Sequence, residues 1–175
     1  LTHDRELQVQ ARLVPIGIAA DAIATQRGYS RAQVDAFAAS SQQRAAAASA
    51  RGHAPSMVAV TDADGTELLD RDENVRPTTT VEKLAELQPA FAAWGAKGGE
   101  QGWDALLCRQ YGLNSIDHVH HAGNSPAMAD GAAVVLVGSA PALERAGLKP
   151  RARILGMADV GSDRTLALTG TVTAA

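Results

Sequence analysis

Three closely spaced histidines, His118, His120 and His121, form the densest group of possible metal ligands in the chain. In an extended segment His118 and His120 would point to the same face, because side chains alternate along a strand. Zinc sites usually need three or four ligands, with a carboxylate or a cysteine at a workable spacing. The pattern therefore favours a structural role, or a place at the rim of an active site, over a metal site.

Two further features could do chemistry. The single cysteine, Cys108, could act as a nucleophile, but a lone cysteine is more often an inert small hydrophobe. The run Asp62-Ala63-Asp64-Gly65 resembles the start of a calcium loop, yet its glycine comes too early and no glutamate follows at the required offset. We expect no metal, no catalytic role for Cys108, and a hairpin turn at 62–65.

Composition and charge narrow the class of protein. The 175 residues could form one domain or pieces of two, and 46% hydrophobic with 20% charged residues is ordinary globular usage. A net charge of −3 predicts no attraction to nucleic acid or to anionic membranes. No apolar run approaches the roughly 18–20 residues of a membrane span, and the first residues lack an apolar signal core. These features predict a soluble, cytoplasmic protein.

The first half of the chain predicts helices and one hairpin. Short helix 18–27 precedes a long helix from 31 to about 51, which Ser30 and Gln33 begin as a capping box and Gly52 ends. Strands at 57–60 and 67–69 flank the turn at 62–65. A second capping box, Thr79 with Glu82, begins a helix that Pro89 stops.

The second half predicts a loop and an α/β layer. The glycine-rich part of 92–119 predicts an exposed, flexible link, followed by a short helix around 103–109. A buried strand at 133–138, a helix at 139–146 closed by Gly147, and a strand at 151–160 then alternate as in α/β proteins.

Several segments, in order along the chain, resemble those of one family. Residues 120–133 read H-H-A-G-N-S-P-A-M-A-D-G-A-A and lead into Val134–Val137; they are similar to the thiolase segment T-A-G-N-x-S-x-x-x-D-G-A-A. Residues 30–45 resemble the family's S-R-x-x-x-D-x-F-A-x-x-S-Q-x-x-A helix. Four further segments of this chain are similar to the family, whose patterns are given in parentheses: 15–24 (M-G-x-T-A-E-N-x-A), 72–79 (D-E-x-x-R-x-x-T), 84–91 (L-A-x-L-x-P-A-F) and, without a pattern, 147–154. The chain thus looks like the middle of a thiolase.

The resemblance implies an α/β, thiolase-like fold, here a helical loop domain with a short hairpin followed by part of a layered α/β domain. Residues 1–91 would be the coenzyme-A-binding loop domain, 92–119 an inserted loop, and 120–175 the start of the C-terminal thiolase half. The insertion is similar to one in a subgroup of bacterial acetyl-CoA acyltransferases that ends in H-V-H-H. The intact protein would be a homodimer or homotetramer.

The resemblance also implies coenzyme-binding positions. Arg76 falls on an arginine that faces the nucleotide end of coenzyme A, where a permanently charged guanidinium suits a phosphate or a base. The alternative for Arg76 is a surface ion pair with Asp70, Asp72 or Glu73. The remaining positions form an apolar wall (Leu87, Ala90, Phe91) and a loop beside the pantetheine arm (Ala122, Gly123, Asn124, Ser125). Pro126 stands where the family usually has serine, and proline offers neither a hydroxyl nor an N–H.

The function that the resemblance implies is acyl transfer, the making or cleaving of the carbon–carbon bond of a 3-ketoacyl-CoA with coenzyme A, as in fatty acid metabolism. Acyl-CoA is the substrate, and no permanently bound cofactor is expected. The family's G-H-P histidine and C-x-G cysteine motifs do not occur in these residues, and Cys108 matches neither catalytic cysteine. We therefore expect no catalytic residue in this portion. The alternative is a non-catalytic thiolase-like chain that acts in coenzyme A binding or subunit assembly.

Overall fold

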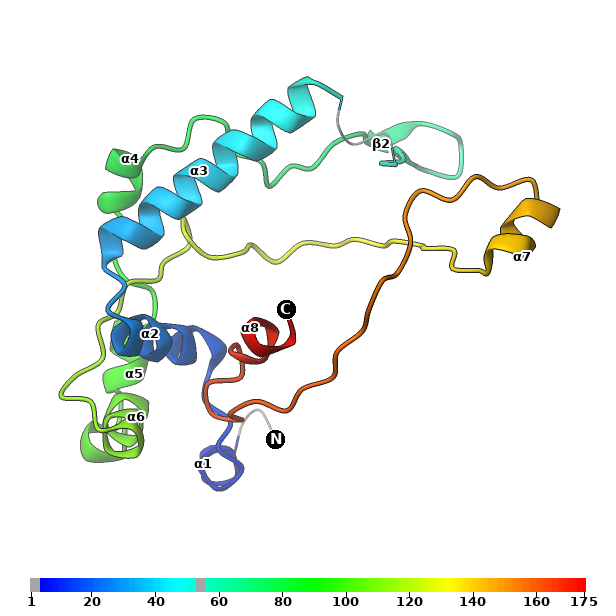
Figure 1. Ribbon diagram of the computed structural model, residues 1–175. Helices are drawn as coiled ribbons and strands as arrows, with labels where there is room; N and C mark the ends of the chain where they lie inside the picture. The colour runs from blue at the N-terminus through cyan, green and yellow to red at the C-terminus, as the bar shows by residue number, and fades with distance from the viewer. Residues whose placement is uncertain (1–3, 53–55) are drawn as a thin grey trace.

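A computed structural model describes residues 4–52 and 56–175. Helices gather at one end of the molecule around α2, and the long α3 runs from there toward the hairpin, whereas α7 lies far away at the tip of two extended stretches (Figure 1). The elements in chain order are α1 (Arg5–Gln10), α2 (Ile16–Arg27), α3 (Arg31–Ala50), β1 (Val60–Thr61), β2 (Glu67–Leu69), α4 (Val81–Ala85), α5 (Ala92–Ala96), the 3-10 helix η1 (Gly99–Gln101), α6 (Trp103–Tyr111), α7 (Ala140–Arg145) and α8 (Gly170–Ala174).

Helices α2 and α3 form where the sequence predicts them. The Ser30 side chain accepts a hydrogen bond from Gln33 N, and the Gln33 side chain accepts one from Ser30 N, so the capping box is confirmed. Gly28 and Gly52 follow the two helices in the left-handed conformation, which glycine adopts without a Cβ penalty. The predicted capping residue Thr79 is wrong by one position: Thr80 accepts from Lys83 N and begins α4.

The hairpin and its turn are also confirmed, although the strands are short. Val60 pairs with Leu69 and Thr61 with Glu67. Asp62 Oδ1 accepts hydrogen bonds from Asp64 N at 3.0 Å and Thr66 N at 2.8 Å, so the carboxylate of this turn is engaged by its own backbone. Residues 57–59, predicted as part of the first strand, remain outside it.

The segment 92–119 is only in part the exposed loop that the sequence predicts: residues 96–101 are exposed, whereas Trp103, Leu107 and Ile116 after them belong to the core. Only its helix around 103–109 was anticipated, and α6 covers it. Gly95 is buried in α5, where a Cβ would collide with the Asp104 carboxylate. This glycine serves close packing between α5 and α6 rather than flexibility. Buried side chains from α2, α6 and later residues form one cluster: Ile18, Ala22, Trp103, Leu107, Ile116 and Leu166.

The predicted strands at 133–138 and 151–160 do not form, and no layered α/β domain is present in the described part of the chain. Val134 to Val137 are 68–98% exposed, and Ile154, Leu155 and Met157 are exposed too. The backbone N–H and C=O groups of a strand need hydrogen-bond partners on a neighbouring strand. Among the described residues, no strand pairs with these two segments. The helix between them is confirmed as α7, closed by Gly147. Helices α1 and α8 were not predicted.

Residues 4–52 and 56–175 include no helix with both the length and the apolar character that crossing a membrane requires.

Replacement of Leu107 by alanine should destabilise the protein, because this side chain is fully buried between α6 and α2. We expect the free energy of unfolding to fall by about 2–5 kcal/mol, as for other buried leucines. Urea unfolding followed by circular dichroism measures the change. Leu68→Ala, at an exposed hairpin position, is the matched control and should change stability little. Equal effects of the two substitutions would contradict the placement of α6 in the core.

Candidate functional site

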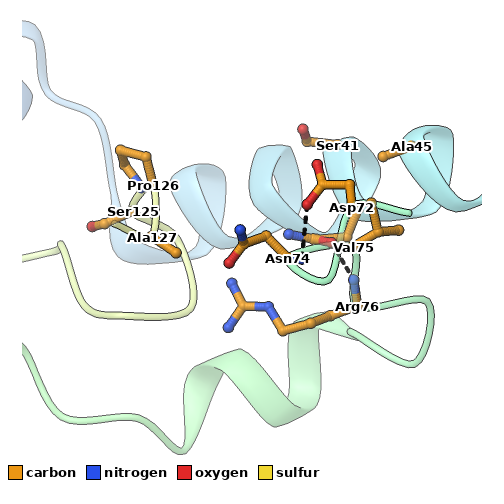
Figure 2. Close-up of a pocket in the computed structure, with 10 residues that line it drawn as sticks. Ser41, Ala45, Asp72, Asn74, Val75, Arg76, Ser125, Pro126 and Ala127 are labelled. Atoms are coloured by element: carbon orange, nitrogen blue, oxygen red, sulfur yellow. Dashed lines mark hydrogen bonds between the residues drawn. The ribbon is translucent and has the colours of Figure 1, made fainter. Parts of the chain in front are cut away.

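A cavity of about 280 Å³ lies where α3, the segment 72–76 and the loop 125–127 meet (Figure 2). Its wall is part polar and part apolar, and hydroxyl, amide, carboxylate and guanidinium groups reach it from three separate parts of the chain. The lining residues are Ser41, Gln42, Ala45, Asp72, Asn74, Val75, Arg76, Ser125, Pro126 and Ala127.

Arg76 is held by its backbone while its side chain stays available. Arg76 N donates to Gln42 Oε1 at 2.7 Å, which ties this segment to α3. Asn74 N donates to Asp72 Oδ1 at 2.8 Å, which shapes the turn before Arg76. The exposed guanidinium makes no ion pair within the described residues, and Asp70 pairs instead with Arg71 at 3.1 Å. The surface ion pair considered for Arg76 is therefore not formed.

The loop that follows His120 is organised by a buried carboxylate of α3, Asp35. Its Oδ1 accepts from His121 Nε2 at 2.8 Å and from Asn124 Nδ2 at 2.9 Å. Its Oδ2 accepts from Arg31 Nε at 2.7 Å. Burial alone would raise the pKa of Asp35, but the hydrogen bonds from Arg31, His121 and Asn124 outweigh it and lower the pKa.

Arg31 extends the same network to α4. Its Nη2 donates to Leu84 O at 2.6 Å and to Leu87 O at 2.8 Å. Leu84 lies in the last turn of α4, where its carbonyl also accepts from Leu87 N at 3.1 Å, and Leu87 follows the helix. One guanidinium thus fixes α4 and the residues after it relative to α3.

A second buried carboxylate, Asp21 of α2, holds the preceding residues. Asp21 Oδ1 accepts from Val119 N (3.0 Å), His120 N (3.1 Å) and His120 Nδ1 (2.6 Å), and Oδ2 accepts from His118 Nδ1 (2.7 Å). Burial would raise the pKa of Asp21, but these hydrogen bonds lower it overall. His118 therefore joins Asp21 of α2 to Asp104 of α6, whose Oδ2 lies 3.0 Å from His118 Nε2.

Both ring nitrogens of His118 face carboxylates, so the charged imidazolium is favoured. Burial lowers the pKa of His118, but Asp21 and Asp104 outweigh that effect and the net pKa is raised. All three histidines thus bind buried carboxylates, which is the structural one of the two roles, structural or at an active-site rim, that the sequence favoured over a metal site. Among the described residues, no group of three or more histidine, cysteine, aspartate or glutamate side chains could hold a metal ion.

The structure brings together some of the predicted coenzyme-binding residues. Arg76 and Ser125 share the cavity, whereas Leu87, Ala90 and Phe91 are not among its lining residues. Phe91 packs on Gly17, against the core. Ala90 N donates to His120 O at 2.9 Å, so the predicted wall adjoins the histidine loop.

The loop residues Ala122, Gly123 and Asn124 lie just before the cavity in the chain and do not line it. Gly123 is buried against Leu84 and Leu87, where a side chain would collide. Both N–H groups of the Asn124 amide are used internally, by Asp35 and by Val119 O.

Sequence reasoning missed the α3 side of the cavity, Ser41 and Gln42, and it missed both buried carboxylates. The sequence held a signal for the buried carboxylates, because Asp21 shares a helix face with the apolar Ile18 and Asp35 with Ala39, and all four are buried. A buried carboxylate needs hydrogen-bond donors. In this protein histidine, arginine and asparagine side chains provide them.

Cys108 lies on α6, away from the cavity, and is half-buried. Burial and the nearby Asp104 carboxylate raise the pKa of its thiol. A raised pKa reduces the thiolate fraction, so this cysteine lacks the activation of a nucleophile.

The fold around this cavity belongs to a known class of domain. The family model described as "Thiolase, N-terminal domain" matches residues 2–98, more than half of the chain. The chain belongs to the thiolase family. It is 41% identical over 155 residues to a "3-ketoacyl-CoA thiolase" of Erwinia tasmaniensis, covering 86% of this chain and 34% of that protein. A "Beta-ketoadipyl-CoA thiolase" of Pseudomonas putida is 40% identical over 145 residues, which cover 81% of this chain and 30% of that protein. The chain therefore spans about a third of the length of these relatives.

His118 should make stability depend on pH above its ordinary pKa of 6.5. Because its pKa in the folded protein is raised, its stabilising effect is complete below about pH 6.5 and is lost as the pH rises through the higher folded value. We expect a larger free energy of unfolding at about pH 6 than at about pH 9, and a smaller difference in His118→Gln. Urea unfolding at both pH values measures this. An identical pH dependence in the variant would contradict the bridging role of His118.

Proposed function

We propose that this chain is a portion of a thiolase-type acyltransferase that makes or cleaves the carbon–carbon bond of a 3-ketoacyl-CoA with coenzyme A. Its part in that reaction is to hold coenzyme A. The observation that carries the proposal is the cavity that joins Arg76 to the loop 125–127 and to α3. The relatives named above as 3-ketoacyl-CoA and beta-ketoadipyl-CoA thiolases support the choice of substrate class.

The chemistry of the cavity suits the nucleotide end of the coenzyme. Arg76 supplies a permanent positive charge that can pair with a phosphate or lie on an adenine ring. Ser41, Gln42 and Asn74 add groups that can donate to phosphate or base atoms. A volume of about 280 Å³ is near the lower end for small-molecule sites, which fits part of a coenzyme and leaves the remainder outside.

The pantetheine arm would extend from the cavity along the loop and the apolar wall. Leu87 and Ala90 are exposed there; Leu87 lies next to the buried Gly123, and Ala90 N donates to His120 O. In this proposal Ala122, Gly123, Asn124 and Ser125 provide the loop surface, and Phe91 supports the wall from the core side. The direct polar contacts would come from backbone groups and Ser125, since the Asn124 amide is already engaged.

The acyl-transfer groups are not assigned to these residues. The thiol of Cys108 has a raised pKa and lies away from the cavity. The intact protein is proposed to be a cytoplasmic homodimer or homotetramer without a permanently bound cofactor.

Replacement of Arg76 by alanine should weaken binding of coenzyme A about tenfold or more, because a hydrogen bond to a charged group contributes about 1.5–3 kcal/mol. Isothermal titration calorimetry with coenzyme A measures the dissociation constant. The matched control is Arg71→Ala, which removes an exposed arginine that pairs with Asp70 outside the cavity. It should leave binding almost unchanged. Binding that is insensitive to Arg76, or equally sensitive to both arginines, would remove the proposed role of this cavity.

The 175-residue chain itself should not cleave acetoacetyl-CoA, because it contributes binding groups and no activated nucleophile. A spectrophotometric assay of acetoacetyl-CoA loss in the presence of coenzyme A tests this directly. Turnover at a thiolase-like rate would show that a catalytic residue in these 175 residues has been overlooked.

A further inference from the structure

The loop from His121 to Asn124 has no regular secondary structure, yet its polar groups form a closed set of hydrogen bonds. His121 N donates to Asn124 Oδ1 at 2.8 Å, and Gly123 N donates to His121 Nδ1 at 3.0 Å. Because Nδ1 accepts from the backbone, Nε2 carries the proton and donates to Asp35. The conformation of this loop is therefore fixed by side chains rather than by a helix or a sheet.

Asp35 is the point at which this hydrogen-bonded set is attached to the rest of the protein. Its Oδ1 receives both His121 Nε2 and Asn124 Nδ2, and its side chain is only 1% exposed. A carboxylate that is buried to this degree must be matched by donors, so moving either partner would leave costly unpaired groups. The orientations of His121 and Asn124 thus depend on a single oxygen atom of α3.

The same helix also forms the far wall of the cavity. Gln42 lies seven residues after Asp35 on α3, two turns along the same face. Ser125, Pro126 and Ala127 follow Asn124 directly and form the opposite wall. Fixing Asn124 against Asp35 therefore sets the separation between the two walls.

We propose that Asp35 is a positioning residue for coenzyme binding, which acts through His121 and Asn124 to hold the loop 122–127 at the correct distance from α3. This inference rests on the proposed function, because it assumes that coenzyme A binds in the cavity. Asp35 itself is buried and does not line the cavity, so it has no direct contact with the ligand.

The chain offers a matched control in Asp21. Asp21 is equally buried and accepts four hydrogen bonds, but its partners are His118, Val119 and His120, before the loop. Asp35→Asn and Asp21→Asn each keep the side-chain shape and remove one buried charge. A purely structural role for Asp35 predicts that both substitutions affect coenzyme binding to a similar extent.

The test compares both variants with the unchanged 175-residue chain, at a temperature where circular dichroism shows them folded. Calorimetric titration with coenzyme A should give a dissociation constant about tenfold or more higher for Asp35→Asn, and within about threefold of the unchanged chain for Asp21→Asn. Hydrogen exchange of the Gly123 amide should accelerate only in Asp35→Asn, because His121 would no longer be held to accept its N–H. Similar dissociation constants for the two variants, or unchanged exchange at Gly123 in Asp35→Asn, would overturn the inference.

The test still gives an answer if Asp35→Asn does not fold, or if the unchanged chain does not bind coenzyme A. If Asp35→Asn does not fold, Asn124→Ala takes its place: it removes the side-chain hydrogen bonds of Asn124 with Asp35, Val119 O and His121 N, and it leaves the pairs of Asp35 with Arg31 and His121 intact. It should weaken binding at least fivefold, in line with the loss of buried hydrogen bonds, and unchanged binding would overturn the inference. If the unchanged chain fails to bind coenzyme A, the proposed function falls, and the inference with it. Binding by the unchanged chain with equal losses in both aspartate variants would remove the inference alone.

Discussion

The burial of two carboxylates is the constraint on which the rest of this structure depends. Asp21 and Asp35 are almost completely inaccessible, and an ionised carboxylate is costly to bury unless it is fully hydrogen-bonded. Helices α2 and α3 cannot satisfy them alone. The donors come mainly from residues 118–124, which are separated from the two aspartates by 86–99 positions in the sequence. Folding of the helical half therefore requires the histidine segment to return and lie across both helices.

Local rules account well for α2, α3 and the hairpin. Ser30 with Gln33, Gly28 and Gly52 determine helix ends through groups within one turn, so their effect can be inferred without knowing the fold. The turn at Asp62 is equally local. The family resemblance implied that Arg76 faces the nucleotide end of the coenzyme and that Ser125 lies beside its pantetheine arm; in the structure both residues line one cavity.

Features that depend on distant partners could not be predicted in the same way. Gly95 suggested a loop, but its lack of a side chain admits the Asp104 carboxylate and allows α5 and α6 to pack. Val134–Val137 have the composition of a buried strand, and composition alone does not supply the neighbouring strands that would bury them. The sequence did not identify Ser41 and Gln42 as part of the cavity wall. A polar helix face becomes a wall only when other segments pack opposite it, and here those are the distant segments 72–76 and 125–127.

The histidine segment divides into two parts at the peptide between His120 and His121. Before it, His118 and His120 bind Asp21, and His118 also binds Asp104 and so attaches α6 to α2. After it, His121 and Asn124 bind Asp35 and lead into the cavity wall. At the division itself His120 O accepts from Ala90 N, so the wall that precedes α5 is joined to the same point. The segment between Phe91 and His118 therefore packs into the core with α2 while the cavity loop is held separately, because the end of the segment is fixed by Asp21 and the loop by Asp35.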